Sequence, residues 1–192
     1  MAQNQLALFG ADAALPDGFV YQPEVISASD ETALLTHVRE LPFRDFEFQG
    51  FVGKRRVVSY GWKYDFNERN LLKVDDIPEF LLPLREVAAD FAGLAPAELQ
   101  HVLVSEYQAG AGIGWHRDKA VFGDVIGISL LAPCRFRLRR KAGTKWDRAA
   151  LTAEPRSAYL LRGPSRTEWE HSIPDVDTLR YSITFRNLRD PG

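Results

Sequence analysis

The 192-residue chain has one cysteine, one methionine and no long apolar run. The lone Cys134 excludes an internal disulfide and any metal site built from several thiolates. No stretch approaches the roughly 18 apolar residues that a membrane helix needs. No basic leader precedes the short apolar run near the N-terminus, so a secretory signal is not expected. We therefore expect a cytoplasmic protein in a reducing compartment, with no membrane association.

The chain also lacks a large excess of positive or negative charge, with 24 Lys and Arg against 26 Asp and Glu. The formal net charge is −2, so the chain as a whole does not predict nucleic-acid binding, and any such affinity must come from local patches. The length leaves room for one domain. Residues 1–15 are small, polar and rich in alanine, which predicts a flexible arm before a single domain over residues 16–192. We expect a monomer.

The order of apolar patterns predicts two helices followed by a run of strands. The first helix follows a cap at Ser27 or Ser29, and the second ends at Gly93. From residue 101 onward, six short strand-like runs alternate with Gly, Pro or charged turns, which predicts an antiparallel barrel or sandwich. Helices ahead of such strands indicate an α+β fold with the helices packed on one face of the β core.

The triplet His116-Arg117-Asp118 is the first chemical signal. In an extended segment, residues two apart point the same way, so the imidazole and the carboxylate can take adjacent positions on one metal. His171, in a later strand-like run, supplies a third ligand. Two histidines and one carboxylate with open positions form the facial arrangement of non-heme Fe(II) oxygenases. His-x-Asp also arises by chance, and a surface His and Asp in a loop is the alternative.

The second signal is the run from Arg180 to Arg186, which alternates as a strand. Arg180, Ser182, Thr184 and Arg186 share one face, and the apolar residues between them share the other. Arginine binds carboxylates through two parallel donors, so this polar face suits a dicarboxylate. A solvated outer strand face is the alternative.

Together with these signals, three segments carry a family resemblance: SEYQAGAGIGWHRD, EWEHSI and RYSITFR. In this order and spacing, from Val104 to Arg186, they resemble the AlkB family of Fe(II)/2-oxoglutarate-dependent dioxygenases, and in particular a bacterial AlkB-like protein. The resemblance implies a double-stranded β-helix, or jelly roll, with buttressing helices on one face. It also implies hydroxylation of a C–H bond with Fe(II), 2-oxoglutarate and O₂.

The resemblance assigns roles residue by residue. His116, Asp118 and His171 would be the catalytic Fe(II) ligands. Arg180 and Tyr107 would hold the distal carboxylate of 2-oxoglutarate, and Arg186 would lie near its C1 carboxylate. Ser105 and Ser182 stand where the family often has asparagine, and each still offers a hydroxyl to the cosubstrate site.

Two clusters of basic and aromatic residues bear on the substrate. The first holds the candidate substrate-binding residues Arg55, Arg56, Trp62, Lys63 and Tyr64, and the second is a basic run that ends at Arg148. Cations among aromatic rings suit a flipped base in single-stranded nucleic acid and its phosphates. We expect oxidative demethylation, that is repair, of N-alkylated bases. For the second run, a solvated strand with a buried underside is the alternative.

Other readings stay open. Base-repair members often carry a carboxylate two residues after the metal aspartate, where this chain has Ala120. The same chemistry on a tRNA modification, a protein side chain or a small molecule is therefore the alternative, and a non-catalytic jelly roll is a third. Trp115 and Trp169 flank metal ligands; we expect both to point away from the neighbouring ligand and into the core, and a place in the pocket wall is the alternative.

The N-terminal arm holds a further motif. Gln5-Leu6-Ala7-Leu8-Phe9 resembles the pentapeptide by which bacterial repair proteins dock on the sliding clamp. Leu6, Leu8 and Phe9 would fill an apolar groove, and Gln5 would set the register. The alternative is that these apolar residues pack back on the domain.

Overall fold

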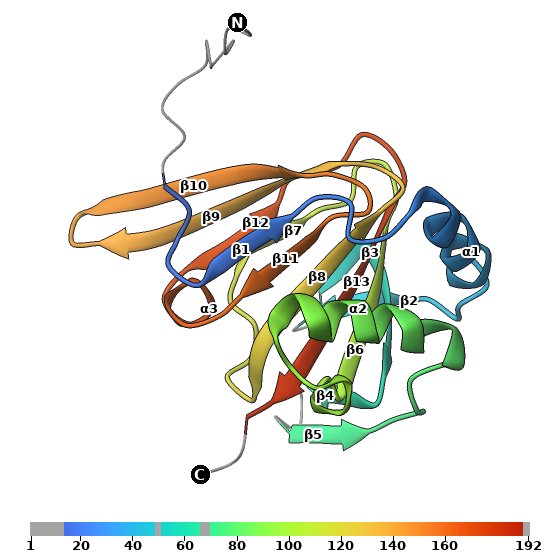
Figure 1. Ribbon diagram of the computed structural model, residues 1–192. Coiled ribbons are helices and arrows are strands. Elements are labelled where there is room, and N and C mark those ends of the chain that lie inside the picture. The colour runs from blue at the N-terminus through green and yellow to red at the C-terminus, as the bar shows by residue number, and fades with distance from the viewer. Residues whose placement is uncertain (1–13, 49–50, 66–69, 190–192) are drawn as a thin grey trace, which may run out of the picture.

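The computed structural model of the chain describes residues 14–48, 51–65 and 70–189 (Figure 1). The clamp-like segment with Gln5, Leu6, Leu8 and Phe9 lies outside the described residues. None of the helices that the structure describes combines the length and the apolar composition of a membrane span.

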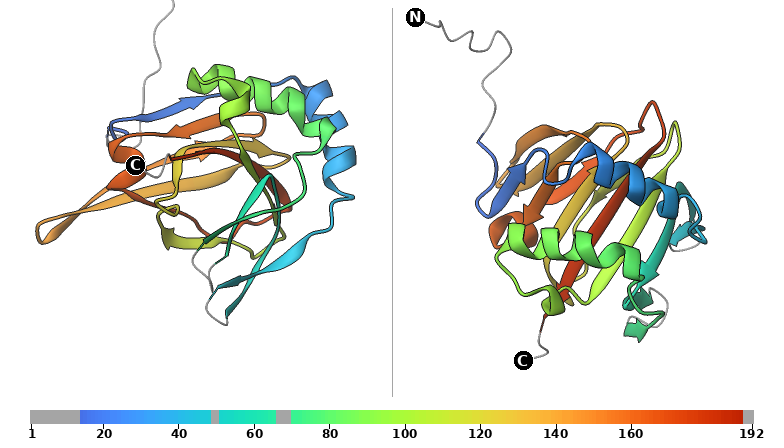
Figure 2. Two further views of the ribbon diagram at one scale, coloured as in Figure 1. Left: turned by 90° about the horizontal axis from the view of Figure 1, so that it is seen from below. Right: turned by 45° about the vertical axis from the view of Figure 1, so that its right-hand side comes forward.

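Two antiparallel sheets form the body of the molecule (Figures 1 and 2). The larger, seven-stranded sheet has the order β1 (Phe19–Gln22), β11 (Ala158–Leu161), β8 (Phe122–Leu130), β13 (Arg180–Leu188), β6 (His101–Tyr107), β3 (Phe51–Tyr60) and β2 (Arg44–Phe48). The smaller, four-stranded sheet has the order β10 (Lys145–Ala153), β9 (Cys134–Ala142), β12 (Glu170–Ile173) and β7 (Ile113–His116). A short hairpin, β4 (Trp62–Asp65) with β5 (Asn70–Lys73), packs beside β3 and β6.

The path of the chain identifies the fold. From β6 onward it passes back and forth between the sheets: β6, β8, β11 and β13 lie in the larger sheet, and β7, β9, β10 and β12 lie in the smaller one. This alternation is the double-stranded β-helix, or jelly roll. The predicted fold class is confirmed.

The start of α1 and the end of α2 lie where the sequence signals place them. In α1 (Ala28–Val38), the Ser27 hydroxyl accepts a hydrogen bond from the Asp30 amide, and the Asp30 carboxylate accepts one from the Ser27 amide. A 3₁₀ turn at Glu79–Leu81 leads into α2 (Leu82–Ala92), which Gly93 ends with a left-handed φ of 65°. A second 3₁₀ turn, Pro96–Glu98, and the one-turn α3 (Pro164–Thr167) complete the helical segments of the described chain.

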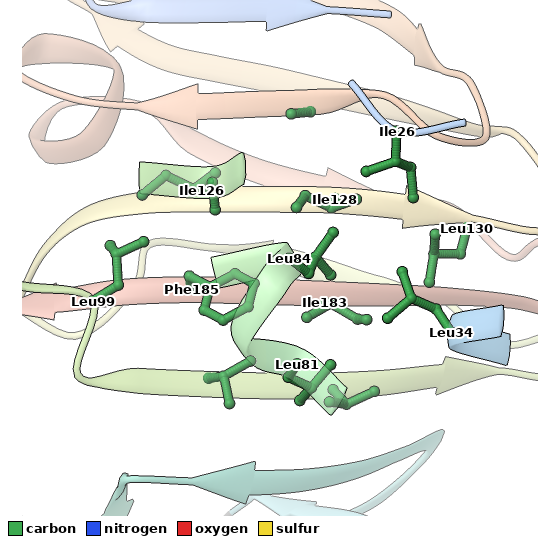
Figure 3. Packing of buried hydrophobic residues seen from close by; sticks show 14 of the residues in the cluster. Ile26, Leu34, Leu81, Leu84, Leu99, Ile126, Ile128, Leu130, Ile183 and Phe185 are labelled. Atoms are coloured by element: carbon green, nitrogen blue, oxygen red, sulfur yellow. The ribbon is translucent and has the colours of Figure 1, made fainter. Parts of the chain in front are cut away.

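The larger sheet is covered on both faces. Helices α1 and α2 cross its outer face (Figure 2), and Figure 3 shows the side chains between them, including Leu34, Leu81, Leu84, Ile126, Ile128, Ile183 and Phe185. Its inner face packs on the smaller sheet through a second apolar cluster that includes Phe19, Phe136, Leu138, Tyr159 and Leu161. The fold therefore has one core under the helices and another between the sheets.

Strand β13 contributes to both cores, as its alternation predicts. Tyr181, Ile183 and Phe185 lie in the core under the helices. Arg180, Ser182, Thr184 and Arg186 are also buried, on the inner face of the sheet. The solvated alternative for this polar face is therefore wrong, and two arginines point into the sandwich.

We predict that Leu84→Ala lowers the free energy of unfolding by about 2–5 kcal/mol, because it leaves a cavity in the core under the helices. Leu84 is 2% exposed, whereas Leu82 on the same helix is 38% exposed. The control Leu82→Ala should change the free energy of unfolding by no more than about 0.5 kcal/mol. Urea denaturation of both variants provides the measurement, and equal losses would contradict this assignment of the core.

Candidate active site

The two expected histidine ligands meet across neighbouring strands. In the antiparallel pairing of β12 with β7, His171 lies directly opposite His116, and their ring centroids are 4.2 Å apart. Asp118 follows two residues after the end of β7. One ligand atom from each of the three residues lies within 4.8 Å of the others. This geometry can hold a divalent metal ion.

The Asp118 carboxylate is held by one oxygen only. Its Oδ1 accepts hydrogen bonds from Arg186 Nε at 2.8 Å and Nη2 at 2.6 Å. Its buried Oδ2 accepts no hydrogen bond from any residue that the structure describes and lies 3.6 Å from His171 Nε2. A buried carboxylate oxygen without a donor is costly. A cation beside His171 would remove that cost, so the donor set fits the Fe(II) that the motifs imply.

The charge states also suit metal binding. Burial is the main reason that the pKa of His171 falls to about 3, and the neighbouring His116 lowers it further. Burial alone would raise the pKa of Asp118, but the charge of Arg186, with smaller contributions from the histidines and Arg166, holds it below its usual value. At neutral pH the site therefore presents neutral His171 and ionised Asp118, the forms that bind metals.

The ring of His116 is oriented by its own strand. Its Nδ1 donates a hydrogen bond to the Gly114 carbonyl at 2.8 Å. This leaves Nε2 as the available ligand atom, an arrangement common in metal-bound histidines. The pKa of His116 is lowered mainly by burial, and Arg55 also contributes to the lowering.

Arg166 of α3 holds the loop that carries Asp118. This buried guanidinium donates to the backbone carbonyls of residues 118, 119, 122 and 123 at 2.7–3.2 Å. It therefore fixes the turn between β7 and β8, from which the carboxylate projects. Sequence reasoning missed Arg166, because no periodic pattern surrounds the one-turn helix.

A second arginine lies in the interior without a carboxylate partner. Arg180 is 1% exposed, and its Nη2 donates to Ser129 Oγ at 3.1 Å. Its Nε and Nη1 are buried and donate to no acceptor in the described chain. The guanidinium carbon lies 4.8 Å from the Tyr107 ring centroid. Two unused buried donors on a charged group fit a carboxylate, such as that of 2-oxoglutarate.

The remaining expected cosubstrate residues share this interior. Ser105 and Ser182 are buried and lie opposite each other in the pairing of β6 with β13. Arg186, expected near the C1 carboxylate, is engaged with Asp118, and its Nη1 lies 3.3 Å from Nδ1 of the buried His101. His101 was not singled out from the sequence, although its place opposite Arg186 on the polar face of β6 could have revealed it.

The first basic and aromatic cluster divides between two faces of the sheet. Arg55 is buried with its guanidinium 4.2 Å from the Phe46 ring centroid. Arg56 points the opposite way and pairs with Glu106 at 2.6 Å. The structure therefore corrects the grouping of these two arginines, because neighbouring residues of a strand face opposite sides.

The hairpin of β4 and β5 supplies the other expected substrate contacts. Trp62 and Tyr64 are half-buried, and Lys63 is exposed. Lys119 Nζ, one residue after Asp118, lies 5.2 Å from the Tyr64 ring centroid. This contact places Tyr64 beside the loop that carries the carboxylate.

The second basic run lies on the smaller sheet, on the face turned away from the metal ligands. Arg148 is exposed there. Trp169 is buried in the core between the sheets, as expected. Trp115 is only half-buried and packs against Arg137 and Arg139, so its expected place in the core is wrong.

Comparison with known proteins agrees with this geometry. A sequence model of the 2OG-Fe(II) oxygenase superfamily matches residues 18–186. The Arabidopsis thaliana protein named alkylated DNA repair protein ALKBH8 homolog is 28% identical over 210 residues, which cover 96% of this chain and 59% of that protein. The Mus musculus protein named tRNA (carboxymethyluridine(34)-5-O)-methyltransferase ALKBH8 is 25% identical, with 90% of this chain and 27% of that protein covered.

A solved structure of OsALKBH1 superposes on 92% of this chain with a TM-score of 0.70 at 17% identity, and all of that chain is covered. This likeness shows the fold. The chain spans 59% of the plant relative's length and 27% of the mouse relative's length.

We predict that Arg166→Lys destabilises the chain by about 2 kcal/mol or more, because one ammonium cannot reach four carbonyls and buried carbonyls are left unpaired. Metal affinity should fall as well, since the loop holding Asp118 loosens. Arg117→Lys is the control, because within the described chain the exposed Arg117 side chain makes a single hydrogen bond, to the Thr167 carbonyl. Thermal unfolding and Mn(II) titration of both variants provide the measurements. Equal stabilities would show that Arg166 does not hold the loop.

Proposed function

Because the chain belongs to the 2OG-Fe(II) oxygenase superfamily and is AlkB-like, we propose that it removes alkyl groups from bases of nucleic acid by oxidation. The chain is a dioxygenase that uses Fe(II), 2-oxoglutarate and O₂. The observation that carries the proposal for the site is the buried Asp118 Oδ2, which has no hydrogen-bond donor within the described part of the chain and lies beside His171.

In this proposal His116, Asp118 and His171 hold the iron. The bound iron, with 2-oxoglutarate and O₂, supplies the oxidising power to hydroxylate a C–H bond while 2-oxoglutarate becomes succinate and CO₂. Arg186 fixes Oδ1 of Asp118 and so directs Oδ2 toward the histidines. His101 accepts from Arg186 and keeps that guanidinium in place.

Arg180 and Tyr107 hold the distal carboxylate of 2-oxoglutarate. The unused Nε and Nη1 of Arg180 are the donors for it. Ser129 already accepts from Nη2, which orients the guanidinium before the cosubstrate binds. Ser105 and Ser182 supply hydroxyls in the same interior. The apolar side chains between the sheets keep water from the reacting atoms.

In this proposal the substrate base binds on the side of the metal site that faces β3 and β4. Arg55 contributes positive charge near His116. Tyr64 and Trp62 offer aromatic faces for stacking, and Lys63 is exposed for phosphate contact. A hydroxylated N-methyl group decomposes to formaldehyde and the unmodified base nitrogen. Arg56 is not part of this proposal, because Glu106 holds it on the far face.

A second candidate is oxidation of a modified base in tRNA. The mouse relative carries a name that refers to carboxymethyluridine in tRNA, and Ala120 replaces the carboxylate often present in base-repair members. The plant relative's name refers to alkylated DNA. The metal and 2-oxoglutarate residues are the same in both candidates, so the substrate distinguishes them.

We expect the full chain, with Fe(II), 2-oxoglutarate and O₂, to convert a methylated single-stranded oligonucleotide into the unmethylated form with equal amounts of succinate and formaldehyde. Mass spectrometry of methylated DNA, methylated RNA and carboxymethyluridine-containing RNA provides the measurement. His171→Ala is the inactive control.

If only the carboxymethyluridine-containing RNA is oxidised, and neither methylated substrate is, the result would favour the second candidate. Succinate formation that His171→Ala retains would overturn the site assignment.

We predict that Arg180→Met weakens 2-oxoglutarate binding roughly ten- to a hundredfold, because a charge-assisted contact contributes about 1.5–3 kcal/mol. The stability of the ligand-free chain should be unchanged or raised, since the variant removes a buried charge without a carboxylate partner. Anaerobic calorimetry and thermal unfolding measure the two effects. The exposed Arg39 provides the control Arg39→Met, which should change neither. Unchanged affinity in Arg180→Met would show that the carboxylate binds elsewhere.

A further inference from the structure

The outward face of strands β9 and β10 carries a cluster that the oxygenase site does not use. Its members, here called the outer basic face, alternate with the core residues of both strands: Arg135, Arg137, Arg139, Lys141, Trp146 and Arg148. The two strands form a hairpin that extends beyond the rest of the molecule (Figure 1; Figure 2, left). Arg135, Lys141, Trp146 and Arg148 are exposed, and Arg137 and Arg139 are half-buried.

Much of the positive charge of this face is not neutralised. Arg135, Lys141 and Arg148 are exposed, and in the part of the chain that the structure describes none of their side chains makes a hydrogen bond or ion pair. Arg137 donates to the neutral Ser172 hydroxyl at 3.0 Å. Among the described residues, Arg139 alone has a carboxylate partner on this face, Glu170 at 2.6 Å. A chain of net charge −2 thus concentrates uncompensated cations on one hairpin.

Aromatic rings lie among these cations in a fixed arrangement. The guanidinium carbon of Arg139 lies 4.4 Å from the ring centroids of both Trp115 and Trp146. Arg137 lies 5.0 Å from the Trp115 centroid. Trp146 is 38% exposed although it belongs to a strand of an ordered sheet. Its ring is therefore held in place and accessible, which suits stacking on a base.

We propose that the outer basic face binds single-stranded nucleic acid, separately from the pocket in which a base is oxidised. Alternate arginines of β9 recur every ~7 Å along the strand, a linear row that matches a linear polyanion. Stacking rings beside backbone-binding cations are the combination that single-strand binding uses. The choice of nucleic acid as the partner rests on the proposed function.

The position of Trp115 connects this face to the site. Trp115 precedes His116 on β7, which is the edge strand of the smaller sheet. The two side chains point to opposite faces of that edge, because His116 faces His171 and Trp115 faces Arg137. A single strand of nucleic acid that crosses the edge of the sheet at β7 can contact both faces. The outer basic face would then anchor the nucleotides that flank the reacting base.

The test measures the binding of labelled single-stranded RNA and DNA that carry no alkylated base, by fluorescence anisotropy over a series of salt concentrations. Arg135→Gln and Arg148→Gln should each reduce the slope of log affinity against log salt by about 0.7. Arg39→Gln removes one exposed charge after α1, far from the hairpin, and should leave the slope unchanged. Trp146→Ala should weaken binding about fivefold or more, and Trp146→Phe should restore most of it.

Any of these outcomes would overturn the proposal: no binding at tens of micromolar in low salt, equal slopes in Arg135→Gln, Arg148→Gln and Arg39→Gln, or equal affinity for an acidic peptide of the same charge. The same measurement on His171→Ala separates this inference from the proposed function. If His171→Ala binds nucleic acid as tightly as the unaltered chain does, the proposed binding by the outer basic face is supported, whether or not the chain demethylates bases. If its binding is lost, the site itself is the nucleic-acid contact and the proposal fails.

Discussion

The pairing of β12 with β7, which sets His171 opposite His116, is the constraint on which the site depends. A shift of one residue would turn His171 to the outer face and remove it from Asp118. The core fixes this register from the other side, since β12 also pairs with β9 and the His171 ring stacks on Phe136 with centroids 5.4 Å apart. Packing between the sheets therefore determines where the ligands lie.

Charge in the interior is arranged around one carboxylate. Asp118 is surrounded by Arg186, Arg166 and two histidines, and the buried Arg180 has no carboxylate partner among the described residues. A divalent cation alone would add to this positive excess, whereas a dicarboxylate that enters with it balances the added charge. The interior is thus complementary to the pair, iron and 2-oxoglutarate together, more than to either alone.

The sequence predicted the parts of the molecule in which local patterns and final contacts agree. The Ser27 cap, the Gly93 end of α2 and the alternation along β13 all survive folding because each depends on neighbouring residues. Strands β1 and β10 were missed, since neither alternates clearly and both are defined by their partners, β11 and β9. Arg166 was missed because no periodic pattern surrounds its one-turn helix and its partners lie far away in sequence. His101 was missed because its contact with Arg186 depends on the pairing of β6 with β13, although its place on the polar face of β6 offered a signal. Arg56 was misgrouped with Arg55 because the two were counted as one basic cluster, although neighbouring residues of a strand face opposite sides, and the pairing with Glu106 shows which side Arg56 takes.

The separation of the two cores by the larger sheet has an evolutionary consequence. Most of the apolar packing against α1 and α2 lies on the face of the sheet that never meets the ligands. Residues that line the interior and the hairpins can therefore change, one substitution at a time, while the helix-covered layer keeps the sheet intact. During evolution, a protein with this scaffold can change its substrate specificity without first acquiring stabilising substitutions elsewhere in the chain.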